Sequence, residues 1–300
     1  MLHHWTRGMK LGGLMLDAPP FYLAVPRDVT KNPLTGLHDD VISKAIREVI
    51  VEPLRRAGTA VFGETYNLLR PSYNKMLDGG RNTDMADGTV GFPSKLHDMV
   101  MAQDATGLET LLQETLDIMA GWSGGAVRTE PDNRGNATIA GQKAAVTALL
   151  GAYFVVRMGA PDCTSPLPTW HSPSGDEWPA GCFGKWIGAD AVATTLRAVH
   201  SHSGLRPGTK RRRLKVVAGG PGAYAALRGD GDREGVVVVF NFASLPTVVN
   251  VDMAGSGVVP GQATVDLIGG TPGPSVPPAG AWAIPVGGHG WLALPVQLQT

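Results

Sequence analysis

Three acidic residues, Asp17, Glu64 and Asp132, each follow a short apolar run in the first half of the chain. Each run has the length of a buried strand. A carboxylate at the end of a strand adds nothing to a hydrophobic core, but in a parallel barrel the C-terminal strand ends form the reaction face. The three acids therefore predict one carboxylate-based site assembled from distant parts of the sequence.

The segments between these runs predict the elements that position the acids. Apolar residues recur at helical spacing over 37–57, and Gly58 stands where such a helix would end. Similar stripes cover 108–119, 140–150 and 189–200. Strands that alternate with amphipathic helices predict a parallel sheet with helical crossovers.

These motifs resemble the alpha-amylase superfamily, glycoside hydrolase family 13. The segment Gly13–Ala18 is similar to the family's fourth-strand motif, Val61–Glu64 to its fifth-strand motif, and Glu130–Arg134 to a worn seventh-strand motif. Residues 141–159 are similar to its seventh helix and eighth strand, and residues 224–242 to its C-terminal β-domain. The resemblance covers most of the chain.

The resemblance implies an α/β fold, a partial (β/α)8 TIM barrel of about strands 4 to 8, followed by a small antiparallel β-sandwich. It implies retaining hydrolysis of an α-glucan or α-glucoside, with Asp17 as nucleophile, Glu64 as general acid and Asp132 as the third acid. The two working carboxyl groups of such a site lie about 5 Å apart. Glu64 would have to keep its proton near neutral pH, which burial and the neighbouring Asp17 and Asp132 would favour.

Several departures from the family pattern fall at the expected site. Met15 stands where the family has an arginine, and Pro131 stands where it has a histidine. Nothing resembles the first three barrel strands. We therefore expect weak turnover and either a truncated copy or a piece of a longer polypeptide, with dimerisation if the part stands alone. The alternative is a non-catalytic amylase-like interaction module, similar to the heavy chains of amino-acid transporters.

Composition limits the other possibilities. The chain of 300 residues has 26 basic and 26 acidic side chains, so its charge implies no attraction to nucleic acid. No apolar stretch reaches the length of a membrane span. Nothing predicts a cofactor or a metal site, since His3 and His4 have no second cluster at ligand spacing. Cys163 and Cys182 could pair or remain free thiols, and the sequence leaves the localisation open.

A domain boundary is predicted near Pro207, with a barrel portion over 1–207 and an all-β domain over 208–300. Short strands are expected at 214–217, 224–228, 236–242, 247–251, 263–268 and 291–294. We expect this domain to cap apolar barrel surface, with carbohydrate binding as the alternative. The basic run Lys210–Arg213 is expected to be a solvated linker.

Overall fold

The computed structural model describes eleven parts of the chain: residue 8 and the ranges 12–16, 43–63, 76–81, 92–114, 127–129, 137–151, 153–154, 189–206, 209–229 and 233–299. Asp17, Glu64, Asp132, Cys163 and Cys182 lie outside these ranges. The chain forms two compact units, one from Met1–Lys95 with Leu112–Thr129, the other from Leu96–Leu111 with Glu130–Thr300. The boundary near residue 207 stays a prediction.

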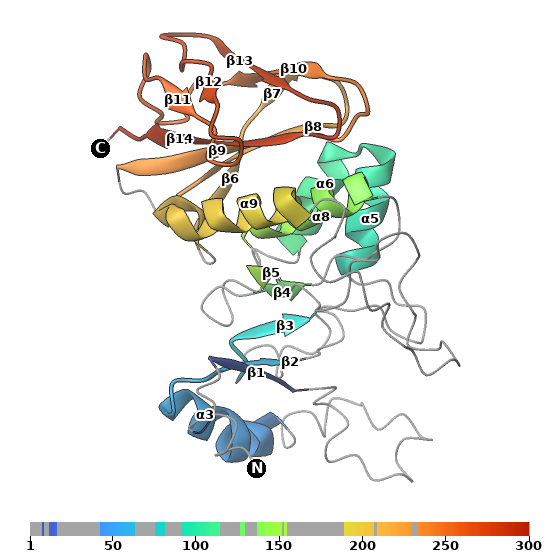
Figure 1. Cartoon of the computed structure of the whole chain (residues 1–300), viewed down its shortest axis with the longest axis vertical. Coiled ribbons are helices and arrows are strands. Elements are labelled where there is room, and N and C mark those ends of the chain that lie inside the picture. Colours follow the sequence, from blue (N-terminus) through green and yellow to red (C-terminus); the bar gives the residue numbers. More distant parts are fainter. Residues whose placement is uncertain are drawn as a thin grey trace. The chain divides into compact units, whose positions relative to one another are not determined.

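The first unit contains four parallel strands. They are β1 (Gly13–Leu16), β2 (Ala60–Gly63), β3 (Gly79–Arg81) and β4 (Val127–Thr129), and they lie side by side in chain order (Figure 1). Parallel neighbours need long crossover connections, which the expected helix between β1 and β2 supplies. The predicted succession of strand, helix and strand is therefore confirmed for the connection between β1 and β2.

The crossover helix carries a π-helical turn, η3 (Arg47–Val51), directly before α3 (Glu52–Arg56). Pro53 explains this local widening, because proline has no N–H and its ring clashes with the carbonyl group one turn earlier. The amide of Glu52 bonds to the carbonyl of Arg47, five residues back. The buried helix side chains Ile46, Val51 and Leu54 then pack against the strands.

The second unit contains a layer of helices beneath a β-sandwich (Figure 1). The helices are α5 (Phe92–Ala102) and α6 (Ala105–Leu112), apart from residues 92–95 and 112, which are counted in the first unit, and α8 (Ala137–Leu149), α9 (Ala189–Ser201) and the short η5 (Ser203–Leu205). A short strand, β5 (Tyr153–Phe154), follows α8. Every residue from 141 to 150 is buried. A helix with no solvated face lies at the centre of its unit, which places α8 there.

The sandwich has a four-stranded antiparallel sheet of β6 (Arg211–Arg213), β8 (Ala223–Arg228), β9 (Glu234–Asn241) and β14 (Trp291–Gln297), in the order β14-β9-β8-β6. A second sheet, in the order β13-β10-β7, contains β7 (Val216–Ala218), β10 (Thr247–Asp252) and β13 (Ala281–Val286). The pair β11 (Thr264–Val265) and β12 (Pro272–Gly273) completes the domain.

Alternation along the strands gives the four-stranded sheet two buried faces. Ala225, Val237 and Leu294 belong to the sandwich core, which also contains the fully enclosed Trp282 of β13. The alternate residues, such as Phe240, are also buried. A strand that is buried on both faces reads as a continuous apolar run, as residues 236–240 do.

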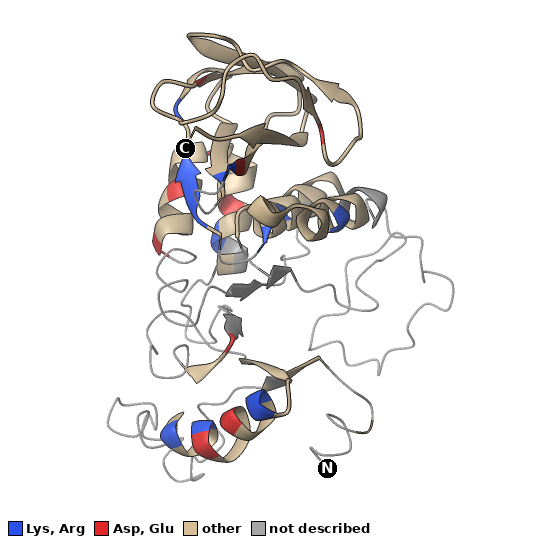
Figure 2. Cartoon of the chain, turned by 90° about the vertical axis from the view of Figure 1, so that its left-hand side faces the viewer, with Lys and Arg blue, Asp and Glu red and all other residues tan. Residues whose placement is uncertain are grey.

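Most of the expected elements in the second unit are confirmed. Helices α8 and α9 and strands β8, β9, β10 and β14 lie where the sequence patterns predict them. The expectation for Lys210–Arg213 was wrong, because Arg211–Arg213 is strand β6, the blue strand near the C-terminus in Figure 2. Its register with β8 brings Arg211 into the interior, where the side chain is only 3% exposed.

Candidate active site

The ends of β1 and β2 are level with each other. Leu16 and Gly63 are partners in the parallel register, and each is the last residue of its strand. Asp17 and Glu64 are the next residues in the sequence. The two strands that precede the predicted nucleophile and the predicted general acid are therefore immediate neighbours, ending together at one edge of the sheet.

Burial distinguishes the two faces of this sheet. Leu16 and Val61 pack with the helix side chains of η3 and α3, so the face of the sheet that carries Leu16 and Val61 is the one covered by the helix. Phe62 belongs to the opposite face, since successive strand residues alternate. Gly13 shares that face, and a Cβ atom there would lie 3.3 Å from Phe62 Cε2.

The register continues across the next two strands. Gly63 is level with Gly80 of β3, and Gly80 is level with Val127 of β4. One residue further along, Arg81 is level with Arg128. The sequence by itself assigned no role to either arginine. Only the pairing of β3 with β4 shows that Arg81 and Arg128 are register partners.

Asp78 anchors the start of β3 to β2. Its Oδ2 accepts a 2.7 Å hydrogen bond from the backbone N–H of Val61, and its own N–H donates to the Val61 carbonyl at 2.8 Å. The guanidinium of Arg55 lies 2.8 Å from Asp78 Oδ1. The Asp78 carboxylate therefore connects α3, β2 and β3. Its contact with β2 is at Val61, two residues before the strand ends at Gly63.

The three predicted acids remain predictions, because Asp17, Glu64 and Asp132 lie outside the described ranges. What the structure describes is the strands before them: β1 and β2 are adjacent, and β4 is separated from β2 by β3 alone. Asp132 comes three residues after Thr129, the last residue of β4. Within the described ranges, no group of three or more His, Cys, Asp or Glu side chains is placed to hold a metal ion.

A buried polar cluster in the second unit links α6 to the β-sandwich. Glu109 Oε2 accepts hydrogen bonds from Arg211 Nη1 at 2.6 Å and from the Tyr224 hydroxyl at 2.7 Å. Burial raises the pKa of Tyr224 far above its ordinary value, although the charge of Arg211 opposes this shift. Burial therefore favours the protonated phenol, which is the form that donates to Glu109.

A second buried cation, Arg228, joins the sandwich to the end of α8. Its Nη1 donates to the carbonyl of Leu149 at 3.0 Å, and its Nη2 donates to the carbonyl of Arg206 at 2.9 Å and to the Thr209 hydroxyl. A cation at a helix C-terminus satisfies free carbonyl groups and interacts favourably with the helix dipole. This arrangement supports a structural role for the sandwich.

Beyond Glu234, the sandwich contains few charged residues (Figure 2). From residue 235 to residue 299, the only acidic or basic side chains apart from His289 are Asp252 and Asp266. Among the described residues, the large apolar side chains that are exposed are all aliphatic: Val49, Met101, Val217, Leu245, Val248 and Val265. Sugar rings are usually held on aromatic faces, and in the described ranges none of these exposed side chains is aromatic.

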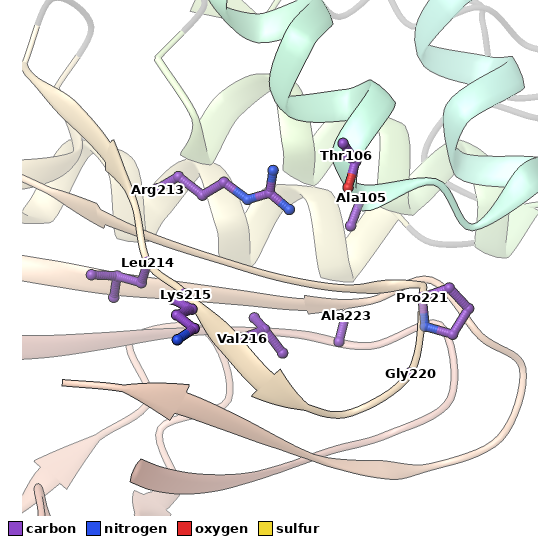
Figure 3. Close-up of a pocket in the computed structure, with 9 residues that line it drawn as sticks. All are labelled: Ala105, Thr106, Arg213, Leu214, Lys215, Val216, Gly220, Pro221 and Ala223. Carbon is purple, nitrogen blue, oxygen red and sulfur yellow. The ribbon is translucent and has the colours of Figure 1, made fainter. Parts of the chain in front are cut away.

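An open cleft of about 460 Å³ lies between the start of α6 and strands β6 and β7 (Figure 3). The guanidinium of Arg213 extends toward Thr106, and Lys215 also lines the cleft, between the two strands. Lys215 Nζ is 4.0 Å from Asp252 Oδ2, and the lysine is largely exposed. Arg213 and Lys215 are both exposed, so this cleft is open to water at the edge of the interface between α6 and the strands.

No helix within the described ranges is long and apolar enough to cross a membrane. No protein-family model and no curated protein matches the sequence. Solved structures do match, and they show that the chain has the fold of alpha-amylases and related glycoside hydrolases. The predicted resemblance is thereby confirmed for the fold.

The individual matches are distant in sequence. An Anoxybacillus alpha-amylase matches with a TM-score of 0.65 and 14% identity over 100% of this chain and 62% of its own. The noncanonic maltogenic alpha-amylase AmyB from Thermotoga neapolitana matches with a TM-score of 0.61 and 13% identity over 99% of this chain and 64% of its own. AmyP in complex with maltose matches with a TM-score of 0.61 and 11% identity, over 97% and 65%. The chain spans less than two thirds of each of these proteins.

Proposed function

We propose that this chain carries the acid residues of an alpha-amylase-type site that acts on α-glucosidic bonds with retention. In this proposal Asp17 is the nucleophile, Glu64 is the acid and base, and Asp132 holds the sugar hydroxyls. The chain would form the partial (β/α)8 barrel of about strands 4 to 8, with the β-sandwich as its cap. The substrate would be an α-glucan or α-glucoside, since one similar structure is described as a complex with maltose.

The register of β1 with β2 carries this proposal. Leu16 and Gly63 end two neighbouring parallel strands at the same level, directly before Asp17 and Glu64. Neighbouring strands lie about 4.8 Å apart, close to the carboxyl separation of about 5 Å that retaining glycosidases use. Inverting enzymes hold their two carboxyl groups further apart to admit a water molecule, so the register supports retention.

The chemistry follows from this arrangement. Asp17 would attack the anomeric carbon while Glu64 protonates the leaving oxygen, and Glu64 would then deprotonate the water that releases the sugar. Met15 precedes the nucleophile where an arginine is expected, and Pro131 offers no hydrogen-bond donor to the sugar. Each lost contact of this kind costs about 3 kcal/mol of transition-state stabilisation. We therefore expect slow turnover.

The test is an assay of the chain on maltooligosaccharides and on p-nitrophenyl α-glucoside, with Glu64→Gln and Asp17→Asn as variants. We expect slow hydrolysis with release of the α-anomer, abolished in both variants. Glu48→Gln is the matched control, because Glu48 is an exposed acid on the crossover helix. Turnover that is unchanged in Glu64→Gln would disprove the role of this residue.

Met15 also favours a second candidate, a non-catalytic amylase-like module. It lies in β1 level with Phe62, so an apolar residue occupies the place of the expected cation. A module of this kind would bind maltooligosaccharides weakly or not at all and would show no turnover. Complete absence of hydrolysis in the wild-type chain, together with a normal thermal unfolding transition, would support it.

A further inference from the structure

Two arginines of strand β6 face helix α6, but only one of them meets an acid there. Arg211 and Arg213 are alternate residues of the strand, so they share one face of the sheet. Arg211 Nη1 lies 2.6 Å from Glu109 Oε2 on the helix. Thr106 comes one turn earlier on α6, and the Arg213 guanidinium extends toward it (Figure 3). The second arginine therefore meets a neutral hydroxyl where the first meets a carboxylate.

The nearby acids leave the positive charge of this cleft in place. Asp104 precedes α6, and its Oδ1 accepts hydrogen bonds from two backbone N–H groups of the first turn, at 3.1 and 2.8 Å, so it caps the helix. Lys215 lies 4.0 Å from Asp252 and is largely exposed. Within the described ranges, no carboxylate forms an ion pair with Arg213. A cleft lined by two cations in this way attracts anions.

The guanidinium of Arg213 is held in position before any ligand arrives. It lies over the ring of Tyr224, 5.8 Å from the ring centre, which is within the range of a cation–π contact. The Tyr224 side chain is fully buried, and its hydroxyl is bonded to both Glu109 and Arg211. A guanidinium that lies over a ring keeps its N–H donors in the plane available for an oxyanion. Its fixed position lowers the entropic cost of binding.

The remaining walls of the cleft are small and apolar. Its volume of about 460 Å³ is within the range of small-molecule sites. A Cβ atom on Gly220 would meet no atom within 4 Å, so the cleft is open at this turn. The apolar lining residues are Ala105, Leu214, Val216, Pro221 and Ala223. An apolar wall beside two cations fits an organic anion better than a bare inorganic ion, because the wall excludes water from an apolar ligand body.

We propose that this cleft binds a small organic oxyanion, with a carboxylate or phosphate group on Arg213 and an apolar body against Leu214 and Val216. The guanidinium can donate two parallel hydrogen bonds to either group. Lys215 adds attraction at longer range, and the Thr106 hydroxyl is a further donor at the same end of the cleft. The proposal is independent of the proposed glycoside hydrolysis, because the acids of that site do not line the cleft.

The experiment titrates the full chain, with labelled methyl groups, and follows binding by nuclear magnetic resonance. The probes are phenyl phosphate, benzoate, inorganic phosphate and benzyl alcohol. We expect phenyl phosphate or benzoate to shift the methyl signals of the apolar lining residues with a saturable response, at lower concentration than the other two probes. The first two probes distinguish a phosphate from a carboxylate, and the last two lack the apolar body or the charge. Added salt should weaken the binding, because the contact is ionic.

The first variant is Arg213→Gln, with Arg197→Gln as its control. Arg197 is an exposed cation on α9 of the same unit, and its Nη2 donates to Thr194 Oγ1 at 3.0 Å. Loss of the charged donor should weaken binding of the aromatic anion about 10-fold, and the control should bind like the wild type. Thr106→Phe keeps both cations but places a ring in the cleft. It should also weaken binding, and it tests the proposal if Arg213→Gln does not fold.

Three results would overturn the proposal. The first is the absence of a saturable shift of the lining methyl groups with either aromatic anion. The second is wild-type affinity for these anions in Arg213→Gln or in Thr106→Phe. The third is equal affinity for inorganic phosphate, which would reduce the cleft to an unspecific region of positive charge. Loss of turnover in Glu64→Gln has no bearing on any of these results, so the proposal and the proposed function fail separately.

Discussion

The Tyr224 hydroxyl donates a 2.7 Å hydrogen bond to Glu109 Oε2, across 115 positions of sequence. The same carboxylate oxygen also accepts a hydrogen bond from Arg211 Nη1. The Arg211 and Glu109 side chains are 3% and 9% exposed. The ring of Tyr224 also lies 5.8 Å from the Arg213 guanidinium carbon. This cluster fastens the first strand of the β-sandwich to helix α6 with charges that are shielded from water.

Replacing Glu109 should be among the most damaging single changes in the second unit. Glu109→Gln leaves the buried charge of Arg211 without this carboxylate, and breaking a buried ion pair in this way costs about 3 to 5 kcal/mol of unfolding free energy. Tyr224→Phe removes one donor and should cost about 1 kcal/mol. Urea unfolding of the two variants measures the difference. Equal losses would show that the ion pair adds nothing beyond the hydrogen bond.

Gly151 should resist substitution more strongly than a turn glycine elsewhere. Its φ is +118°, and a Cβ atom there would lie 2.9 Å from Arg228 Nη1. Gly255, with φ of +66° and no atom within 4 Å of such a Cβ, is the matched control. Gly255→Ala should cost about 1 kcal/mol for the backbone alone, and Gly151→Ala clearly more. Similar melting temperatures for both variants would contradict the close approach of Arg228.

Asp78 should be important for the strands that carry the candidate site. Asp78→Ala removes the acceptor for the Val61 N–H and the partner of Arg55, at a cost of about 1 to 2 kcal/mol given the partial exposure of the pair. Because β2 leads into Glu64, any turnover should fall as well. Glu48→Ala, an exposed acid of the same unit, is the control for stability. An unchanged melting temperature in Asp78→Ala would argue against the anchor.

Stability should fall on mild acidification because of His202. Burial lowers the pKa of His202 below 6.5, an effect that Glu234 partly offsets, and Nδ1 accepts a 3.1 Å hydrogen bond from the Gly204 N–H. The unfolded state therefore takes up a proton first as the pH falls through 6.5, which favours unfolding. An asparagine side chain would keep an acceptor without titrating, so His202→Asn should lose less melting temperature than the wild type between about pH 7.5 and 5.5. Parallel pH curves would exclude His202 as the cause.

The sequence alone predicted the elements whose pattern is long enough to read. The apolar run from Val236 to Phe240 and the helix over 189–201 follow from residue type and periodicity, because burial selects apolar side chains at fixed spacing. The alpha-amylase fold followed from short motifs that end in Asp17 and Glu64. The strands β3 and β13 and the helix α5 were not predicted. β3 has only three residues, and the exposed positions of β13 are Ala281, Ala283 and Pro285, so its alternation does not show in the sequence.

Only the tertiary structure determined which charged residues are buried and which are exposed. Arg211 and Arg213 belong to one basic run, yet Arg211 is buried against Glu109 while Arg213 is exposed at an open cleft. Nothing local separates them, because the partner acid is more than 100 positions away and only strand pairing brings it close. The register that pairs Arg81 with Arg128 also arises only from the pairing of distant strands. Pairing between distant segments depends on register, and register is a property of the assembled sheet.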